Sequence, residues 1–536
     1  MADDESVNLP QTCLPAWSVA DLPEPKRLGL HNLTGFVGPG IVMCGIQIGG
    51  GEWLFGPEIT ARYGGGLMWI ATVAIVCQVF YNIECGRYAL YCGEPIFTGF
   101  MRSRPGPRFW IAVFALLNAG ALIPGLSTHG AAVFASFLLD HPAGEDDRWL
   151  VSLLAYLFLG VVSLPILVGG KVYNMLQVVF TTKVFCVLGF CLVIGVLFVS
   201  PANWLNVFSG FLKFGNVPVA DGGGGETVVN AVGFYFAEGH WPIIAIGNIA
   251  VLAGFAGFAG GGGLSNSTYS NFVRDKGWGM GSHVGAIPSA VGGRQISLSH
   301  LGTVFPINEE NLRRWRGWWK YIITDQVFIW GPGCFMGMAL PALISIEYAQ
   351  YSELYYQTQR FDWAQAIITA DGLRHAPRFS PGVAHLLWLV TLLMGLLVLL
   401  PSQMSIVEDV CRRWTDIIWS GSRRVRESMG TGHVKRIYYT ILAVYVTWTF
   451  VCAYLFTTFG NPRLMVLVIA NLSNVAIGLT SFLVLWTNLR LLPGPLRPGW
   501  ISRIGVICCG MFYLGLASLV FYEKQLPALQ EVLGWK

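Results

Sequence analysis

The sequence predicts an all-α polytopic membrane protein of about eleven transmembrane helices, arranged as two inverted repeats of five spans plus one additional helix. Composition is the first observation. Of the 536 residues, 54% are hydrophobic and 12% are charged, whereas soluble domains contain about 25% charged residues. The second observation is a series of apolar runs, many close to the ~20 residues that cross a bilayer. The third is a pair of glycine-rich interruptions that lie five spans apart.

Eleven segments are expected to cross the membrane. In chain order they cover residues 35–62, 67–91, 109–138, 149–168, 177–199, 241–272, 319–344, 382–404, 436–457, 463–488 and 500–521. We expect an N-terminal tail at 1–30, a single transmembrane domain at 31–521 and a C-terminal tail at 522–536. Within the domain, the two repeats are expected at about 35–200 and 241–490, and the eleventh helix at about 500–521. The first 27 residues lack the apolar core of a cleavable signal peptide.

The charges of the connecting loops predict the orientation. Arginine and lysine are frequent before the first span and after the second, sixth, eighth and tenth spans. The alternate loops include the acidic segment 140–147. Because positively charged loops stay inside, we expect a cytoplasmic N-terminus and an outside C-terminus in a bacterial-type inner or plasma membrane. An odd number of spans agrees with this topology.

The first span is expected to break at three consecutive glycines, followed by two larger side chains and, later, by Pro57. The residues concerned are Gly49, Gly50, Gly51, Glu52 and Trp53. One glycine inside a helix costs about 1 kcal/mol. Three in succession with a proline soon after therefore favour an interruption.

The sixth span carries a longer run in the middle, namely Gly260, Gly261, Gly262 and Gly263. Close helix packing through small residues would explain isolated pairs such as Gly254 and Gly257, but it explains contiguous runs less well. Unwound backbone at membrane depth is tolerated only where it is buried in protein or lines a cavity. Paired interruptions in two halves mark the binding site of an inverted-repeat transporter, so we expect the substrate site between these two breaks.

Polar side chains near the breaks complete the candidate site. The expected substrate-binding residues, besides the seven glycines, are Glu52, Trp53, Asn266 and Gln403. Glu52 is also the candidate metal ligand, because an ionisable residue inside a membrane is costly unless it is paired or solvated. Towards the inner side, a structural salt-bridge network is expected among Glu408, Asp409, Arg412 and Arg413. The segment 274–279 suits an inner gate or an interfacial anchor.

Several motifs resemble the Nramp family of divalent-metal transporters. The stretch GPGIVMCGIQIGGGEW, followed by YGGGLMW, resembles the family's first span. PSQMSIVEDVCRRWTDIIW is similar to its eighth span, and NLRLLPGPLRP to the boundary after its tenth. The resemblance is distant, covers most of the chain, and implies the LeuT-type fold.

The chain departs from the family at the residues that bind metal. Where the family has Asp-Pro-Gly-Asn, this sequence has Gly49, Gly50, Gly51 and Glu52, and the family's methionine falls in or near Gly260–Gly263. The third span lacks the acidic residues that the family uses for proton movement. The resemblance therefore does not carry over the thioether metal site or the usual proton path.

Two kinds of substrate fit the remaining groups. Carbonyls and one carboxylate form an all-oxygen set, which suits a hard divalent ion such as Mg²⁺ or Mn²⁺, and this is the leading expectation. The alternative is a small organic solute such as an amino acid or amine, with Glu52 on its amine and Trp53 stacked on the cation. A receptor or an enzyme has little support, since no large signalling domain or nucleophile–base cluster is evident. The expected partners are the substrate and the lipid bilayer, with no cofactor and no nucleic acid.

Overall fold

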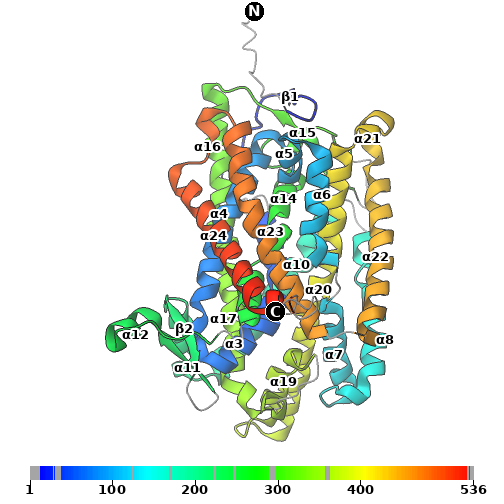
Figure 1. The fold of residues 1–536 in the computed structure, drawn as a ribbon. Helices are drawn as coiled ribbons and strands as arrows, with labels where there is room; N and C mark the ends of the chain where they lie inside the picture. Colours follow the sequence, from blue (N-terminus) through cyan, green and yellow to red (C-terminus); the bar gives the residue numbers. More distant parts are fainter. Residues whose placement is uncertain are drawn as a thin grey trace, which may run out of the picture.

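The computed structural model describes most of the chain and shows a bundle of helices (Figure 1). The described residues are 12–27, 29, 38–122, 125–167, 172–220, 225–245, 249–288, 297–356, 363–459, 462–527 and 530. Within them, nine helices are long and apolar enough to cross a membrane. The predicted first and third spans are each built from shorter helical pieces. The predicted start of the first span, at 35–37, lies outside the described residues.

The first repeat contains helices that match the first five predicted spans. They are α2 (Pro39–Gln47), η2 (Gly51–Phe55) and α3 (Gly56–Tyr63); α4 (Trp69–Cys92), followed by α5 (Ile96–Arg102); α6 (Pro107–Leu117), η4 (Ala119–Leu122) and α7 (Gly125–Leu139); α8 (Arg148–Val161) and α9 (Leu164–Leu167); and α10 (Val172–Phe198). The third span is interrupted after Leu117, which its continuous apolar pattern did not predict.

The second repeat and the eleventh span follow the same order. Their elements are α13 (Ile249–Phe258), η7 (Gly263–Thr268) and α14 (Tyr269–Lys276); α16 (Glu309–Ile323), η8 (Thr324–Trp330) and α17 (Gly331–Tyr348); α20 (Pro381–Gly421); α22 (Val434–Phe459); α23 (Pro462–Leu491); and α24 (Trp500–Val520). At 41 residues, α20 is much longer than its predicted span of 382–404. Its last turns carry charged residues and therefore fall outside an apolar window.

The connections add short helices and a little β-structure to the all-α bundle. They include α11 (Pro201–Gly210), α12 (Ala231–Glu238), α15 (Gly281–Val284), α18 (Glu353–Tyr356), α19 (Ile368–His375) and α21 (Arg423–Ser428). The strands are β1 (Ser18–Val19), β2 (Asn216–Ala220), β3 (Glu226–Asn230) and β4 (Thr303–Val304). β2 and β3 form an antiparallel hairpin, and β1 pairs in parallel with β4.

The two ends of the bundle differ in charge, as the loop pattern predicted. Figure 1 shows α5, α15, α16 and α21 at one end, here the α16 end, and α11, α12 and α19 at the other, the α19 end. The arginine-rich segments around α5, α16 and α21 share the α16 end, whereas the acidic segment 140–147 joins α7 to α8 near the α19 end. The assignment of the α16 end to the cytoplasm remains a prediction from the positive-inside rule.

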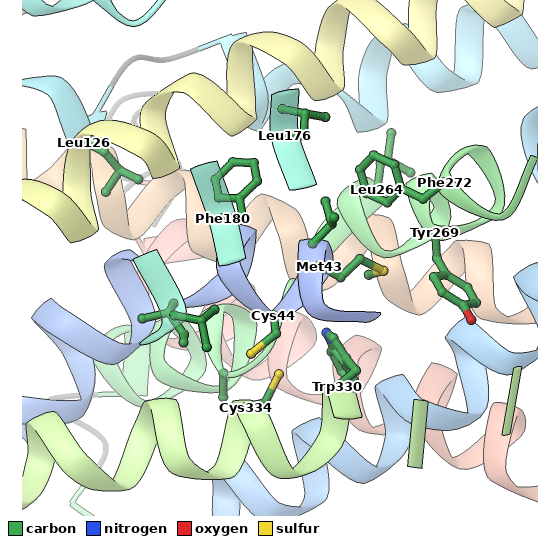
Figure 2. Close-up of a cluster of buried hydrophobic side chains, with 14 of the residues drawn as sticks. Met43, Cys44, Leu126, Leu176, Phe180, Leu264, Tyr269, Phe272, Trp330 and Cys334 are labelled. Atoms are coloured by element: carbon green, nitrogen blue, oxygen red, sulfur yellow. The ribbon is translucent and has the colours of Figure 1, made fainter. Parts of the chain in front are cut away.

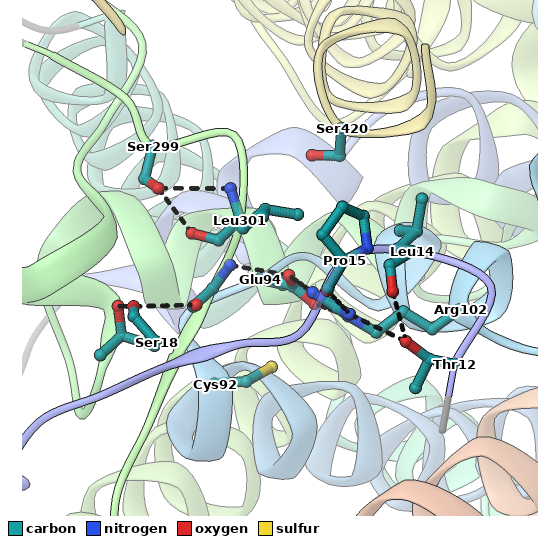
Figure 3. A network of polar contacts seen from close by, with 12 residues as sticks. Thr12, Leu14, Pro15, Ser18, Cys92, Glu94, Arg102, Ser299, Leu301 and Ser420 are labelled. Carbon is teal, nitrogen blue, oxygen red and sulfur yellow. Dashed lines mark hydrogen bonds and ion pairs between the residues drawn. The ribbon is translucent and has the colours of Figure 1, made fainter. Parts of the chain in front are cut away.

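Part of the predicted N-terminal tail is packed against the α16 end. Figure 3 shows residues 12–18 crossing the ion pair between Glu94 and Arg102, whose N···O distance is 2.5 Å. Arg102 also donates to the carbonyl oxygen of Pro15 at 2.8 Å, and Trp318 of α16 donates to the carbonyl oxygen of Pro23 at 2.7 Å. These bonds join the segment to both repeats, so residues 12–27 belong to the folded domain.

Candidate functional site

The first span breaks where predicted. α2 ends at Gln47, Ile48 leaves the helix with ψ 87°, and the chain resumes a helical conformation at Gly50 before the π-helical turn η2. The interruption is therefore narrower than the full glycine run, because Gly51 is already helical. A Cβ on Gly51 would lie 2.3 Å from the carbonyl oxygen of Phe258 at the end of α13. The glycine allows the two broken spans to touch.

The sixth span breaks between Phe258 and Gly263, which confirms the second predicted interruption. Gly260, Gly262 and Gly263 have φ of +94°, +71° and +61°, in the left-handed region that favours glycine. A Cβ on Gly262 would lie 1.8 Å from the carbonyl oxygen of Gly257. This backbone conformation therefore requires the glycine run.

A buried glutamine of α4 satisfies the unwound backbone of the sixth span. The Oε1 atom of Gln78 accepts hydrogen bonds from the amides of Gly261 and Gly262, at 2.8 and 3.3 Å. Its Nε2 atom donates to the carbonyl oxygen of Ala259 at 2.7 Å. Backbone groups without partners are costly at membrane depth, so Gln78 stabilises the break directly.

A cavity lies between the two breaks. Its walls include all seven predicted glycines, together with polar groups from several spans, namely Gln47, Asn118, Ser265, Ser402, Ser405 and Ser473. Apolar walls come from Leu117, Leu126, Phe258 and Ile469. The volume of about 90 Å³ is well above the ~10–15 Å³ that a single water molecule needs.

A second cavity opens towards the α19 end. It has a volume of about 620 Å³ and is lined by Leu54, Glu58 and Gln365 among others. Glu58 accepts a hydrogen bond from Gln365 at 2.6 Å. Gly51 lines the first cavity and Leu54 the second, so one turn of the broken helix separates the two spaces.

Glu52 does not line the cavity between the breaks. Its side chain folds back, and Oε2 accepts a hydrogen bond from the Gly49 amide at 2.9 Å. Oε1 is buried and has no hydrogen-bond partner among the described residues. The Lys183 ammonium of α10 makes no ion pair with this carboxylate, but it reaches the first break through Ser402, whose hydroxyl donates to the Ile48 carbonyl oxygen at 3.3 Å. Lys183 is fully buried and donates to Ser402 Oγ of α20 at 2.6 Å.

The other predicted side chains do not line the cavity either. Trp53 is buried against Gly395 of α20, where a Cβ would lie 3.0 Å from the indole Nε1. Asn266 donates to Gln78 Oε1 at 3.0 Å and to Asn82 Oδ1 at 2.9 Å, so it supports the break. Gln403 is buried, and neither of its amide atoms has a partner among the described residues. The structure thus brings the seven glycines together at the cavity and leaves these four side chains outside its walls.

An ion cluster closes the cavity towards the α16 end. Asp409 and Arg413 line the cavity and pair with each other, and Ser265 donates to Asp409 Oδ2 at 3.1 Å. Beyond them, Arg274 of α14 pairs with Asp416 of α20 at 2.6 Å. The cluster also contains Asp275, Glu408 and Arg412. It confirms the salt-bridge network predicted among Glu408, Asp409, Arg412 and Arg413 and extends it to the end of the sixth span.

The elements around the first break are held by a dense core. Figure 2 shows Cys44 of α2 pointing towards Cys334, with Trp330 nearby, whereas Met43 extends towards Tyr269 and Phe272. The Nε1 atom of Trp330 donates to Gln47, the last residue of α2. This packing fixes the end of α2 at the cavity.

Sequence reasoning missed three buried polar residues, Gln78, Lys183 and Asp325. Asp325 lies in η8, is fully buried, and accepts a hydrogen bond from the Gly40 amide at 2.8 Å, at the start of α2. A signal existed for two of them, because Lys183 and Asp325 are ionisable residues inside predicted spans. The role of Gln78 had no such signal, since its partners lie far away in the sequence.

Comparisons with known proteins show the fold. No protein-family model matches the chain, and no curated protein matches it in sequence. A mutant of the Eremococcus coleocola manganese transporter is similar in structure, with a TM-score of 0.59, 12% identity, and coverage of 96% of this chain and 94% of that one. The same transporter in complex with an aromatic bis-isothiourea substituted compound has a TM-score of 0.59, 11% identity, and coverage of 98% and 95%. The chain therefore has a distant Nramp-like fold of the LeuT type.

Proposed function

We propose that this protein is a secondary transporter of a small zwitterionic organic solute of the amino-acid class, which binds between the broken first and sixth spans. The observation that carries the proposal is the presence of one buried acidic and one buried basic side chain at the first break: Glu52 accepts from the Gly49 amide, and Lys183 reaches Ile48 through Ser402. The two opposite charges sum to zero, and the solute is also neutral overall.

Two cavities on either side of one helical turn support transport. The cavity at the breaks is closed towards the α16 end by the ion cluster, and the larger cavity opens towards the α19 end. Alternating access in such folds is largely a rocking of one bundle against the other around a fixed site. The turn between Gly51 and Leu54 is the element that would open or close the passage.

A helix N-terminus, which carries a partial positive charge, and two helix C-termini, which carry a partial negative charge, border the cavity. The half-helix that begins at Gly50 presents its N-terminus, which favours a carboxylate. α2 ends at Gln47 and α13 at Phe258, and both residues line the cavity, so two helix C-termini face an ammonium group. The apolar wall that includes Leu126 would receive a small side chain. The cavity therefore offers complementary groups for the carboxylate, the ammonium group and the side chain of a zwitterion.

A divalent cation, the leading expectation from the sequence, is the second candidate. The buried Oε1 atom of Glu52 without a partner favours it, and the backbone oxygens would add hard ligands. The Lys183 ammonium opposes it, because it repels a cation and cancels the charge of the nearby carboxylate. Burying a divalent charge without compensating negative charge is costly. The charge balance therefore favours the organic solute.

Uptake into proteoliposomes tests the proposal. The purified protein is assayed with each of the twenty radiolabelled amino acids and, separately, with Mg²⁺, Mn²⁺ and Ca²⁺. We expect uptake of one or more small amino acids and no uptake of the metals. Transport of a divalent ion without any amino acid would refute the zwitterion proposal in favour of the second candidate.

A matched pair of glycine variants tests the location of the site. Gly50 lines the cavity, and a Cβ there would lie 3.1 Å from Leu126 Cδ2, so Gly50→Ala is tolerated but narrows the cavity. Gly189 of α10 has open space around its Cα, so Gly189→Ala is the control. We expect Gly50→Ala to raise KM for the larger accepted amino acids at least several-fold. Equal kinetics in both variants would place the site elsewhere.

A further inference from the structure

We propose that an arm of the protein lies in the membrane–water interface, bound to lipid through an aromatic face, and that it anchors α3 there. The hairpin arm consists of β2, β3, α12 and residues 239–245. Its last part returns to β2, where the Ala245 amide donates to the Pro218 carbonyl oxygen at 2.8 Å. Figure 1 shows α12 standing apart from the helical bundle on one side, at about the level of α3. Lipid contact of this kind goes beyond the proposed transport function and does not depend on the substrate.

The hairpin arm exposes large apolar side chains. No residue of α12 is buried. Phe236 of α12 and Ile243, which follows the helix, are 81% and 88% exposed. The other exposed large apolar side chains of this segment are Val232, Tyr235, Trp241 and Ile244. A contiguous exposed apolar patch marks a contact with a membrane or with another protein, so the arm has a face that needs a cover.

The apolar surface of the arm continues the lipid-facing surface of the bundle. α10 is long and apolar enough to cross a membrane, so its exposed apolar side chains face lipid. The chain runs from α10 through α11 directly into β2. Along this path the exposed apolar side chains are Val193, Val196, Leu197, Leu205, Leu212 and Phe214. Because this surface reaches the arm without interruption, lipid is the cover that we assign to it.

The residue types of the arm suit the interfacial region of a bilayer. Tyrosine and tryptophan are enriched there, because each ring is apolar and carries one polar group that reaches water. Tyr235 and Trp241 stack on each other with their ring centroids 4.8 Å apart. Residues 214–273 include no lysine or arginine, and the charged residue of α12 is Glu238. The arm therefore binds through apolar and aromatic contacts and does not need anionic headgroups.

The hairpin arm also holds the turn between α3 and α4. Tyr63, the last residue of α3, donates from its hydroxyl to Glu226 of β3, and Arg62 pairs with the same carboxylate at 3.5 Å. Trp69, the first residue of α4, donates to the Asn216 carbonyl oxygen of β2 at 2.9 Å. Both strands of the hairpin are thus bonded to the end of the first span and the start of the second.

These bonds connect the arm to the half-helix beside the larger cavity. Gly225, which precedes β3, lines that cavity together with Glu58 and Arg62 of α3. Interfacial tryptophan and tyrosine residues set the tilt of the membrane segments that carry them. An arm held in the interface therefore fixes the depth at which α3 ends, and the remainder of the broken first span moves relative to that fixed end.

Photo-crosslinking identifies what covers the arm. p-Benzoylphenylalanine replaces Phe236 in protein reconstituted into pure phosphatidylcholine vesicles, and the mass of the intact protein is measured after irradiation. We expect an adduct of one phosphatidylcholine, as for the same replacement at Val193 of α10. The replacement at Val19, which is exposed on β1 at the α16 end, is the control and should give no lipid adduct. A crosslink to a second copy of the protein at Phe236, or no adduct there while Val193 is labelled, would overturn the proposal.

Hydrogen–deuterium exchange in the same vesicles tests the anchoring of α3. The double variant Phe236→Ser and Trp241→Ser removes two exposed aromatic side chains from the arm. Its matched control is Phe109→Ser and Trp500→Ser, which removes the same two residue types from exposed positions at the starts of α6 and α24, near the α16 end. We expect amide exchange of residues 56–67 to rise at least about threefold in the first variant and to stay unchanged in the control. Equal rates in the two variants would overturn the anchoring role. Neither measurement uses a substrate, so either result is independent of the proposed transport function.

Discussion

Replacing Gln78 by methionine is expected to destabilise the protein by about 3 kcal/mol. The amide of Gln78 makes five hydrogen-bond contacts: with the backbone of Ala259, Gly261 and Gly262, and with the side chains of Asn266 and Tyr513, at 2.5–3.3 Å. Hydrogen bonds between membrane helices contribute about 0.6 kcal/mol each on average. Methionine keeps the length and apolar volume of the side chain but makes none of these bonds.

Gln403→Met provides a matched control. Both glutamines are fully buried, but neither amide atom of Gln403 has a partner among the described residues. An unsatisfied buried polar group costs about 1–3 kcal/mol, so its removal should leave stability unchanged or raise it. The same substitution is therefore expected to have opposite effects at two positions in one protein.

Unfolding in mixed micelles of a mild detergent and sodium dodecyl sulfate measures the difference. The free energy of unfolding of the Gln78 variant should lie below that of the Gln403 variant by at least ~3 kcal/mol. A difference under about 1 kcal/mol would refute the view that Gln78 satisfies the broken backbone. The assay also tests Gln403 as a substrate ligand: if the prediction from the sequence is correct, an amino acid should stabilise the unsubstituted protein but not Gln403→Met.

Three further predictions concern the break, the ion cluster and the α16 end. Gly262→Ala should prevent folding, because φ at this residue is +71° and a Cβ would lie 1.8 Å from the Gly257 carbonyl oxygen. Size-exclusion chromatography of the purified variant checks this, and a monodisperse peak would contradict it. Arg412→Met should lower the free energy of unfolding by about 3–5 kcal/mol, because it leaves the buried carboxylates of Asp275 and Glu408 without their positive partner. A loss below about 1 kcal/mol would contradict this prediction. At the α16 end, burial raises the pKa of Glu94, but the charge and hydrogen bonds of Arg102 outweigh it and hold that pKa below its usual 4.5. The stability from this pair is therefore present above about pH 4.5 and lost as the pH falls through the lower, folded pKa. Glu94→Gln should be less stable at pH 7 and approach the unsubstituted protein in acid; a constant difference across the pH range would contradict the assignment.

Local sequence determined the features that depend on residue type alone. Apolar runs of transmembrane length predicted the eleven spans, because a bilayer accepts only such segments with their backbone bonds satisfied. The glycine runs predicted both breaks, because the positive φ angles at Gly260, Gly262 and Gly263 are strained for other residues. Loop charges predicted which connections share one end of the bundle.

The tertiary structure decided where the chemistry of the site lies. Glu52 was expected to face a substrate, but it turns back to the Gly49 amide, and the neighbouring Lys183 comes from a span more than a hundred residues away. Gln78 reaches the sixth span over a similar separation. Such pairings depend on how helices pack side by side, and periodicity along one helix does not specify its partner across the bundle. The sequence alone therefore located the breaks, whereas packing determined which charges balance beside them.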